Sequence, residues 1–111
     1  MNSNFIKKSV NDISEVKVIN GIFRKTLVNN PDIMMVFFRL EKGAELPLHS
    51  HPHLQIGYII SGKLEFYVNG KSEILKSGDS YLVERNIEHG AKVLEDTYVI
   101  DIFQPSRDDY K

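Results

Sequence analysis

Short apolar segments separated by turn residues are the feature of this sequence that most restricts its fold. Seven glycines and four prolines are spread along the 111 residues. The segments between them are rich in Val, Ile, Phe and Tyr, which favour strands. No segment keeps a 3.6-residue apolar period over three helical turns. The pattern predicts strands over residues 21–28, 34–40, 55–61, 63–68, 71–75, 80–83 and 98–103.

The clearest predicted hairpin joins two of these strands through Asn69 and Gly70. Asn-Gly is a strong signal for a type I′ turn, because that turn needs a positive φ at both central positions. Leu64, Phe66 and Val68 would then share one face of the sheet. We therefore expect an antiparallel all-β fold, either a barrel or a sandwich.

The length of the chain bounds its domain organisation. A chain of 111 residues can bury one hydrophobic core, whereas two full-size domains are ruled out. We expect a single domain over residues 1–111, with a leading strand or arm over about 1–20 and a barrel over about 34–104.

The charge balance argues against several classes of partner. Lys and Arg number 14 against 15 Asp and Glu, which gives a net charge of −1 and little attraction for nucleic acid or anionic lipid. The longest apolar run, residues 33–38, is far short of the ~20 residues that a spanning helix requires. The first twenty residues hold no apolar block that resembles a signal peptide, so we expect a cytoplasmic protein.

Three of the four histidines lie within residues 49–53, and the fourth is His89. In an extended segment His49 and His51 point to the same side, so both imidazoles could reach one ion. A bend after them would let Gln55 supply an amide oxygen, and His89 would arrive from a neighbouring strand. The alternative is that the histidine segment is a solvated turn without a metal, and spacing alone leaves both open.

These residues resemble the two sequence motifs of the cupin superfamily. The first motif is matched by Gly43, His49, His51, Gln55 and Gly62, with Gln in the place of the usual Glu. The second is matched by Gly78 and His89, with Glu84, Asn86 and Val93 in the places of Pro, Gly and Asn. The resemblance implies a single-domain jelly-roll β-barrel whose interior holds one metal, with the ligands His49, His51, Gln55 and His89.

The implied ligand set carries no charge, because Gln55 replaces a carboxylate. A divalent ion in such a site keeps its full formal charge and is a stronger Lewis acid. Three imidazoles and one amide oxygen suit Zn, Ni, Fe, Co or Mn, and the donor set does not choose among them. His53 matches no ligand position, so we expect it to orient a neighbour or to lie on the surface.

Asp101 is the single carboxylate in the apolar segment 98–103. Alternation places Val99, Asp101 and Phe103 on one face of the strand. If that face looks into the barrel, burial raises the pKa of Asp101 while a nearby cation lowers it, and such a group can exchange a proton with a substrate. An edge position facing water is equally compatible with the pattern.

Arg107 follows the last predicted strand and could fold back over the barrel mouth. Its planar guanidinium is suited to holding a carboxylate through two hydrogen bonds. The ordinary alternative is a solvated ion pair with the neighbouring Asp108 or Asp109.

A narrower resemblance, to the small pectin-degradation cupins of the KdgF type, covers about residues 43–110. It rests on residues 49–58, 61–62, 78–81 and 101–109. It implies an isomerase-type enzyme that converts 4,5-unsaturated uronate monosaccharides, released by pectin or alginate lyases, to the linear keto form. The functional Asp, Phe and Arg of that group fall on Asp101, Phe103 and Arg107.

The resemblance implies a division of labour within the site. The metal would polarise a substrate oxygen, Asp101 would move the proton, Arg107 would hold the uronate carboxylate and Phe103 would pack against the sugar. Two rival functions stay open: a cupin dioxygenase that uses Fe and O₂, and a non-catalytic sugar-binding domain. A homodimer is also expected, because an N-terminal strand could pair across an interface and cover exposed edges.

Overall fold

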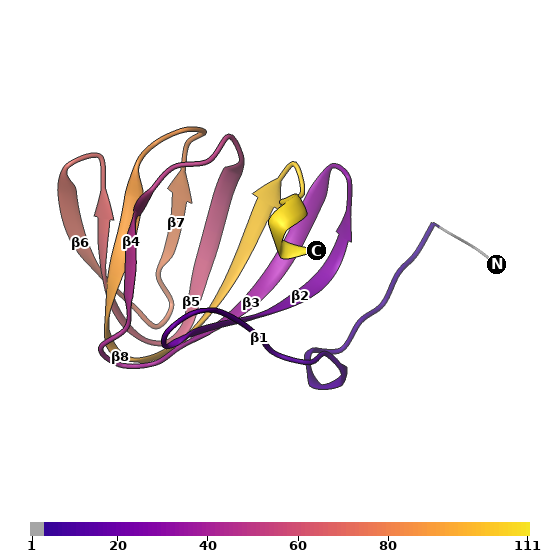
Figure 1. Cartoon of the computed structure of the whole chain (residues 1–111), viewed down its shortest axis with the longest axis horizontal. Coiled ribbons are helices and arrows are strands. Elements are labelled where there is room, and N and C mark those ends of the chain that lie inside the picture. The colour runs from indigo at the N-terminus through magenta and orange to yellow at the C-terminus, as the bar shows by residue number, and fades with distance from the viewer. Residues whose placement is uncertain (1–3) are drawn as a thin grey trace.

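The computed structural model describes residues 4–111, and within them the chain is built of strands and two short 3-10 turns, without an α-helix (Figure 1). The elements are η1 (Val10–Asp12), β1 (Val16–Ile19), β2 (Ile22–Asn30), β3 (Ile33–Leu40), β4 (Glu45–His49), β5 (Leu54–Val68), β6 (Lys71–Lys76), β7 (Ser80–Val83), β8 (His89–Gln104) and η2 (Asp108–Tyr110). The prediction of an all-β chain is confirmed.

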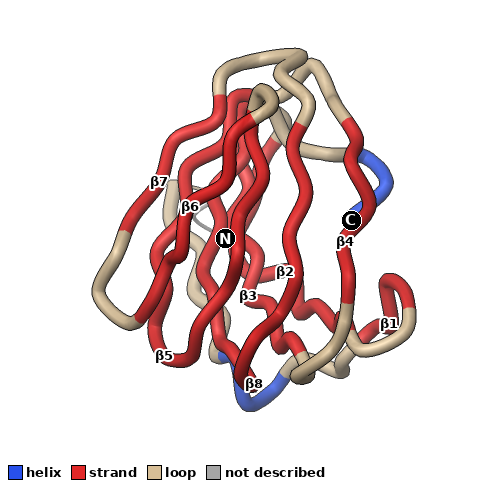
Figure 2. Tube along the Cα trace, turned by 90° about the vertical axis from the view of Figure 1, so that its left-hand side faces the viewer, coloured by secondary structure: helices blue, strands red, loops and turns tan. Residues whose placement is uncertain are grey.

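The two longest strands, β5 and β8, organise the whole antiparallel sheet. They pair with each other from Leu54↔Gln104 to Val68↔His89. The strand order is β1-β2-β3-β8-β5-β6, while β4 also pairs with β8 and β7 with β5. Because each long strand changes neighbours along its length, the sheet curls around its inner face, as the two views at right angles show (Figure 2). The result is the predicted jelly-roll barrel.

Two predicted strand boundaries were wrong. The expected strands over 55–61 and 63–68 are one strand, β5, because Gly62 (φ +101°) sits in an irregular stretch of pairing and does not form a turn. The last strand, predicted over 98–103, begins at His89. The division into an arm over about 1–20 and a barrel over about 34–104 stays a prediction.

The predicted hairpin turn is confirmed by its backbone. Asn69 (φ +50°) and Gly70 (φ +78°) are both left-handed, and they connect β5 to β6 in the expected register. Asn86 (φ +64°) is left-handed as well, which is why Asn can replace the usual Gly of the second cupin motif.

Strand alternation decides which side chains enter the barrel. On β8, Val99, Asp101 and Phe103 are 2%, 5% and 1% exposed, whereas Tyr98 is 42% exposed. The edge position considered for Asp101 is therefore excluded. The hydrophobic core includes Met34, Val36, Ile59, Leu64, Phe66, Val83 and Val93.

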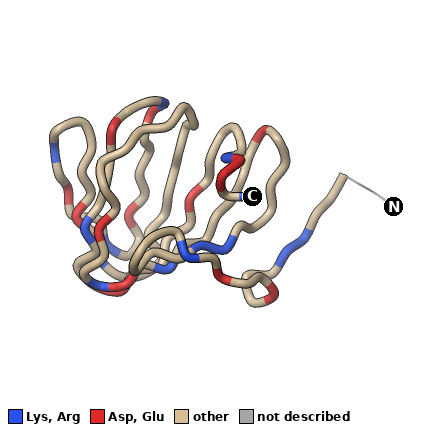
Figure 3. Tube along the Cα trace, in the orientation of Figure 1, with Lys and Arg blue, Asp and Glu red and all other residues tan. Residues whose placement is uncertain are grey.

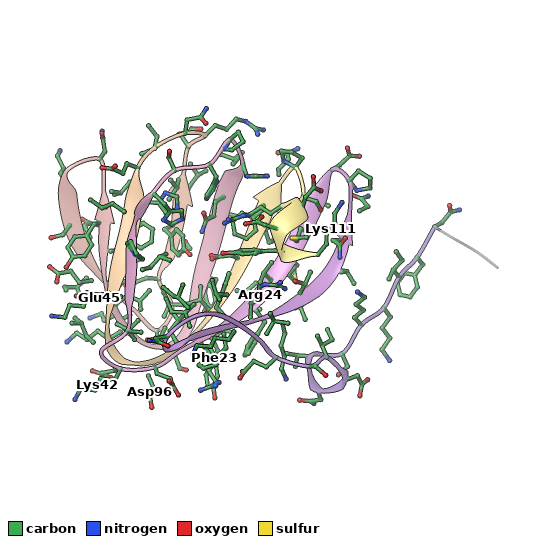
Figure 4. The ribbon with its side chains drawn as sticks, in the orientation of Figure 1. Phe23, Arg24, Lys42, Glu45, Asp96 and Lys111 are labelled. Carbon is green, nitrogen blue, oxygen red and sulfur yellow. The ribbon has the colours of Figure 1, made fainter. Side chains whose placement is uncertain are left out.

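Charged residues are dispersed along the chain (Figure 3). Some fasten the turns: the Lys42 amide donates to Asp96 Oδ1 at 2.8 Å, and both residues lie at the lower edge of the barrel in Figure 4. No helix in residues 4–111 has the length and apolarity needed to cross a membrane.

Candidate metal centre

Three histidine side chains converge inside the barrel. His49 on β4 is the direct cross-strand partner of His89 on β8, and their ring centroids are 4.4 Å apart. His51 follows two residues after His49, and its ring lies 5.0 Å from that of His89. One possible ligand atom from each of the three lies within 4.8 Å of the other two.

Backbone carbonyls fix the orientation of two of these rings. His49 Nδ1 lies 3.0 Å from the Pro47 carbonyl oxygen, and His89 Nδ1 lies 2.8 Å from that of Ile87. A carbonyl oxygen can only accept, so both Nδ1 atoms carry a proton, and in the neutral form of each ring the lone pair is on Nε2. This is the arrangement that usually supports metal-bound histidines.

His51 is buried and carries an unused polar atom. Its Nε2 contacts Gln55 Oε1 at 3.0 Å, while its Nδ1 has no hydrogen-bond partner among residues 4–111. Burial, helped by the positive charge of Arg107, lowers the pKa of His51 to about 4. Burial also lowers the pKa of His89. Burial therefore favours the neutral imidazoles of His51 and His89, which is the form that binds a metal.

The donor set fits a divalent transition metal. Three imidazoles and the Gln55 amide oxygen lie together, and the buried Nδ1 of His51 has no hydrogen-bond partner in the part of the chain that the structure describes. Imidazole and amide donors of this kind suit Zn, Ni, Fe, Co or Mn. His53 lies outside the group of three, with its ring 5.3 Å from that of His51.

Asp101 lies directly beside this cluster. Gln55 Nε2 donates to Asp101 Oδ2 at 3.2 Å, and the Tyr81 hydroxyl donates to Oδ1. Burial raises the pKa of Asp101 to about 7, against the opposing effects of the Tyr81 and Gln55 hydrogen bonds and the Arg107 charge. Asp101 can therefore exchange a proton near neutral pH.

Arg107 is held at the edge of the site by its neighbours. Its Nε and Nη2 donate to the two Asp109 carboxylate oxygens at 3.2 and 2.9 Å. Its guanidinium lies 3.9 Å from the Tyr110 ring centroid and 5.1 Å from that of Phe103. The Arg107 side chain is only 12% exposed. The ion pair considered from the sequence is therefore present, but its guanidinium is not solvated. The partner is Asp109, but the guanidinium is largely buried.

The C-terminal segment is anchored across β2. Arg24 Nη1 donates to the Tyr110 carbonyl at 3.0 Å, and the Thr26 hydroxyl donates to the same oxygen. In Figure 4 Arg24 lies below this segment, close to the C-terminal Lys111. The anchoring keeps Arg107 and Tyr110 over the inner face of the sheet.

These side chains open into a single cavity. Its polar and aromatic lining includes His49, Gln55, Tyr81, His89, Asp101, Phe103, Arg107 and Tyr110. The cavity thus brings three predicted ligands, His49, Gln55 and His89, together with the predicted functional residues Asp101, Phe103 and Arg107. The fourth predicted ligand, His51, does not line the cavity and joins the site through the histidine cluster. Tyr81, Tyr110 and Gly57 were not assigned a role from sequence. The sequence signal that could have pointed to the contact of Tyr81 with Asp101 is Gly57, because a glycine inside a strand and away from any turn often marks a close approach of other groups.

A jelly-roll barrel with histidines converging on its inner face defines a cupin-type protein. The model of the cupin domain family matches residues 36–103. The chain belongs to the cupin family.

Within the family, the chain is similar to KdgF proteins. It is 40% identical over 93 residues to the pectin degradation protein KdgF of Dickeya dadantii (strain 3937), covering 82% of this chain and 84% of that protein. The structure of KdgF from Halomonas sp. matches with a TM-score of 0.92 and 34% identity, over 97% of this chain and all of the other. An RmlC-like cupin from Shewanella frigidimarina NCIMB 400 matches with a TM-score of 0.92 and 30% identity over the full length of both chains. The chain is a KdgF-type cupin.

Proposed function

We propose that the protein is an enzyme that converts 4,5-unsaturated uronate monosaccharides to the linear keto form with the help of one divalent metal. The observation that carries the proposal is that Asp101 and Arg107 line the same cavity as Gln55 and two members of the histidine cluster, His49 and His89. The similarity to a protein named for pectin degradation supports a uronate as substrate.

Recognition of the substrate is assigned to the end of β8 and the segment after it. Arg107 would bind the uronate carboxylate, because guanidinium and carboxylate match in geometry and charge. Phe103 and Tyr110 would provide an apolar wall for the sugar ring, since both rings line the cavity and contact each other edge to face with centroids 5.8 Å apart.

His49, His51, Gln55 and His89 would hold the metal, which supplies Lewis acidity toward a substrate oxygen when bound. Asp101 would accept the proton of the C1 hydroxyl as the bond between C1 and the ring oxygen breaks, which leaves an aldehyde at C1 and an enolate at C4 and C5. The same carboxyl would then return that proton to C4 of the enolate, which leaves a ketone at C5. The reaction gains and loses no atoms, so it requires neither oxygen nor water as a reactant.

An anaerobic assay tests this function. Metal-loaded protein is mixed under nitrogen with unsaturated galacturonate prepared by a lyase, and the ultraviolet absorbance of the conjugated enol ether is followed. We expect the absorbance to fall with wild-type protein and to persist with Asp101→Asn, which should keep its metal. A requirement for oxygen would favour the dioxygenase, and binding without consumption would favour the sugar-binding domain.

Two further predictions accompany this function. We propose that the protein is a homodimer, because apolar side chains on the outer faces of β5 and β7 are exposed, among them Ile56, Tyr58 and Leu82. The cytoplasmic location expected from the sequence also stays a prediction.

A further inference from the structure

Tyr81, Gly57 and Asp101 form one row across three neighbouring strands. Gly57 on β5 is the cross-strand partner of Tyr81 on β7 and also of Asp101 on β8. Neighbouring strands lie about 4.8 Å apart, so side chains on the two outer strands of such a trio start about 10 Å apart. They can meet only if the residue between them leaves room.

Gly57 leaves that room. A side chain carbon added to Gly57 would overlap Asp101 Oδ1 and the hydroxyl end of the Tyr81 ring. The phenol therefore lies over the glycine, and its hydroxyl reaches the Asp101 carboxylate. Because Gly57 has no positive φ, its small size and not its backbone freedom is what the site uses.

The two donors to Asp101 act on different oxygens. Gln55 Nε2 holds Oδ2 from one side, and the Tyr81 hydroxyl holds Oδ1 from the other. A carboxylate held at both oxygens cannot rotate freely about its terminal torsion. Each oxygen still keeps a lone pair, since a carboxylate offers about four acceptor positions.

We propose that Tyr81 is a positioning residue that holds Asp101 in the orientation required for proton transfer, with Gly57 providing the space for the contact. The inference rests on the proposed function, because it assigns Tyr81 a part in that same reaction. Tyr81 would act through Asp101, whereas binding of the sugar acid would depend on Arg107 and the aromatic wall. Loss of the hydroxyl should therefore lower kcat and leave KM nearly unchanged.

The test compares Tyr81→Phe with a matched control in metal-loaded protein. Tyr67 also donates its hydroxyl to a carboxylate, Glu65 Oε1 at 3.0 Å, but it lies outside the cavity. We expect Tyr81→Phe to lower kcat by about 10- to 100-fold, the usual range for groups that orient a functional residue. KM should stay within about twofold, and Tyr67→Phe should behave as wild type.

A double-variant cycle separates positioning from a general structural effect. If Tyr81 acts through Asp101, adding Tyr81→Phe to Asp101→Asn should change the residual rate by less than about twofold. The metal content and thermal unfolding of each variant are measured alongside.

An unchanged kcat in Tyr81→Phe would overturn the inference while leaving the proposed function intact. A loss that persists in full on the Asp101→Asn background would also overturn it. Wild-type protein that does not consume the uronate would instead overturn the proposed function, and this inference with it.

Discussion

The side-chain amide of Gln55 donates a hydrogen bond from Nε2 to Oδ2 of Asp101 at 3.2 Å. The same amide places its oxygen 3.0 Å from His51 Nε2, so it joins the histidine cluster to the buried carboxylate. A glutamate has no N–H to donate and would place a second carboxylate against Asp101. This contact is a physical reason for the Gln that replaces the usual Glu of the first cupin motif.

The first prediction concerns that contact. Gln55→Glu should retain the metal, because a carboxylate can also ligate it. It should lower kcat by at least about 10-fold, because the hydrogen bond to Asp101 is lost and two adjoining carboxylates raise the pKa of one of them. Metal per chain and kcat are measured together. Gln104→Glu adds the same charge at an exposed position and serves as control. An unchanged kcat in Gln55→Glu would show that the amide is not needed.

The second prediction concerns the Arg107–Asp109 pair. Asp109 occupies Nε and Nη2 of Arg107, which leaves the edge formed by Nη1 and Nη2 for a substrate carboxylate. Arg107→Ala should raise KM by about 10- to 100-fold with little change in kcat, because hydrogen bonds to charged groups are strong. Asp109→Asn should raise KM by about three- to tenfold by loosening the guanidinium.

Asp108→Asn is the matched control for Asp109→Asn. Asp108 is 93% exposed and pairs with Lys111, so its loss should leave KM unchanged. Equal effects of the two substitutions would mean that net charge near the cavity mouth, and not the Arg107–Asp109 geometry, determines binding.

The third prediction concerns pH and the stability of the metal-free protein. The folded-state pKa of His51, about 4, lies below its unfolded value, so acidification from pH 7 to 4 protonates the unfolded chain first and destabilises the fold. The folded-state pKa of Asp101, about 7, lies above its unfolded value, so the stability it contributes is present at low pH and is lost as the pH rises through 7.

Single substitutions should therefore shift the pH profile in opposite directions. On acidification from pH 7 to pH 4, the free energy of unfolding of Asp101→Asn should fall relative to that of wild type by about 1 to 3 kcal/mol. Over the same pH change, that of His51→Gln should rise relative to wild type by about 1 to 3 kcal/mol. Urea unfolding at both pH values gives the measurement. Profiles parallel to that of wild type would contradict the opposed pKa shifts.

The fourth prediction concerns the outer sheet face. Leu82 is 57% exposed and is the cross-strand partner of Ile56, which is 42% exposed. We expect a dimer by light scattering, and Leu82→Glu should convert it to a monomer because the charge would be buried in the interface. Ile74, 49% exposed on β6, provides the control Ile74→Glu. A monomeric wild-type protein would contradict the proposed dimer.

Local chemistry was sufficient for part of the fold. The Asn69-Gly70 turn and the inward face of Val99, Asp101 and Phe103 followed from φ preferences and strand alternation, which depend on a few adjacent residues. β4 was missed because Pro47 lies within it, and proline usually argues against a paired strand. The polar first half of β8, residues 89–97, was missed because its apolar alternation is interrupted by charged side chains.

In the site, too, the features set by neighbouring residues were predicted, whereas those set by strand pairing were not. Ligand spacing placed His49 and His51 on one side of the chain, and the cupin resemblance supplied His89. The contact of Tyr81 with Asp101 depends on the pairing of β7, β5 and β8 and on the missing side chain of Gly57. That tyrosine and the aspartate are 20 positions apart in the sequence, and spacing along the sequence does not reveal which strands become neighbours.

Metal content is the most direct test of the site. Purified protein is loaded in turn with Zn, Ni, Fe, Co and Mn, and the bound metal is measured by mass spectrometry in wild type, His51→Ala, His89→Ala and His53→Ala. We predict one metal per chain in wild type and in His53→Ala, and loss of most of it in the other two variants. Wild-type protein that binds none of the five metals, or His51→Ala protein with wild-type content, would contradict the proposed metal centre.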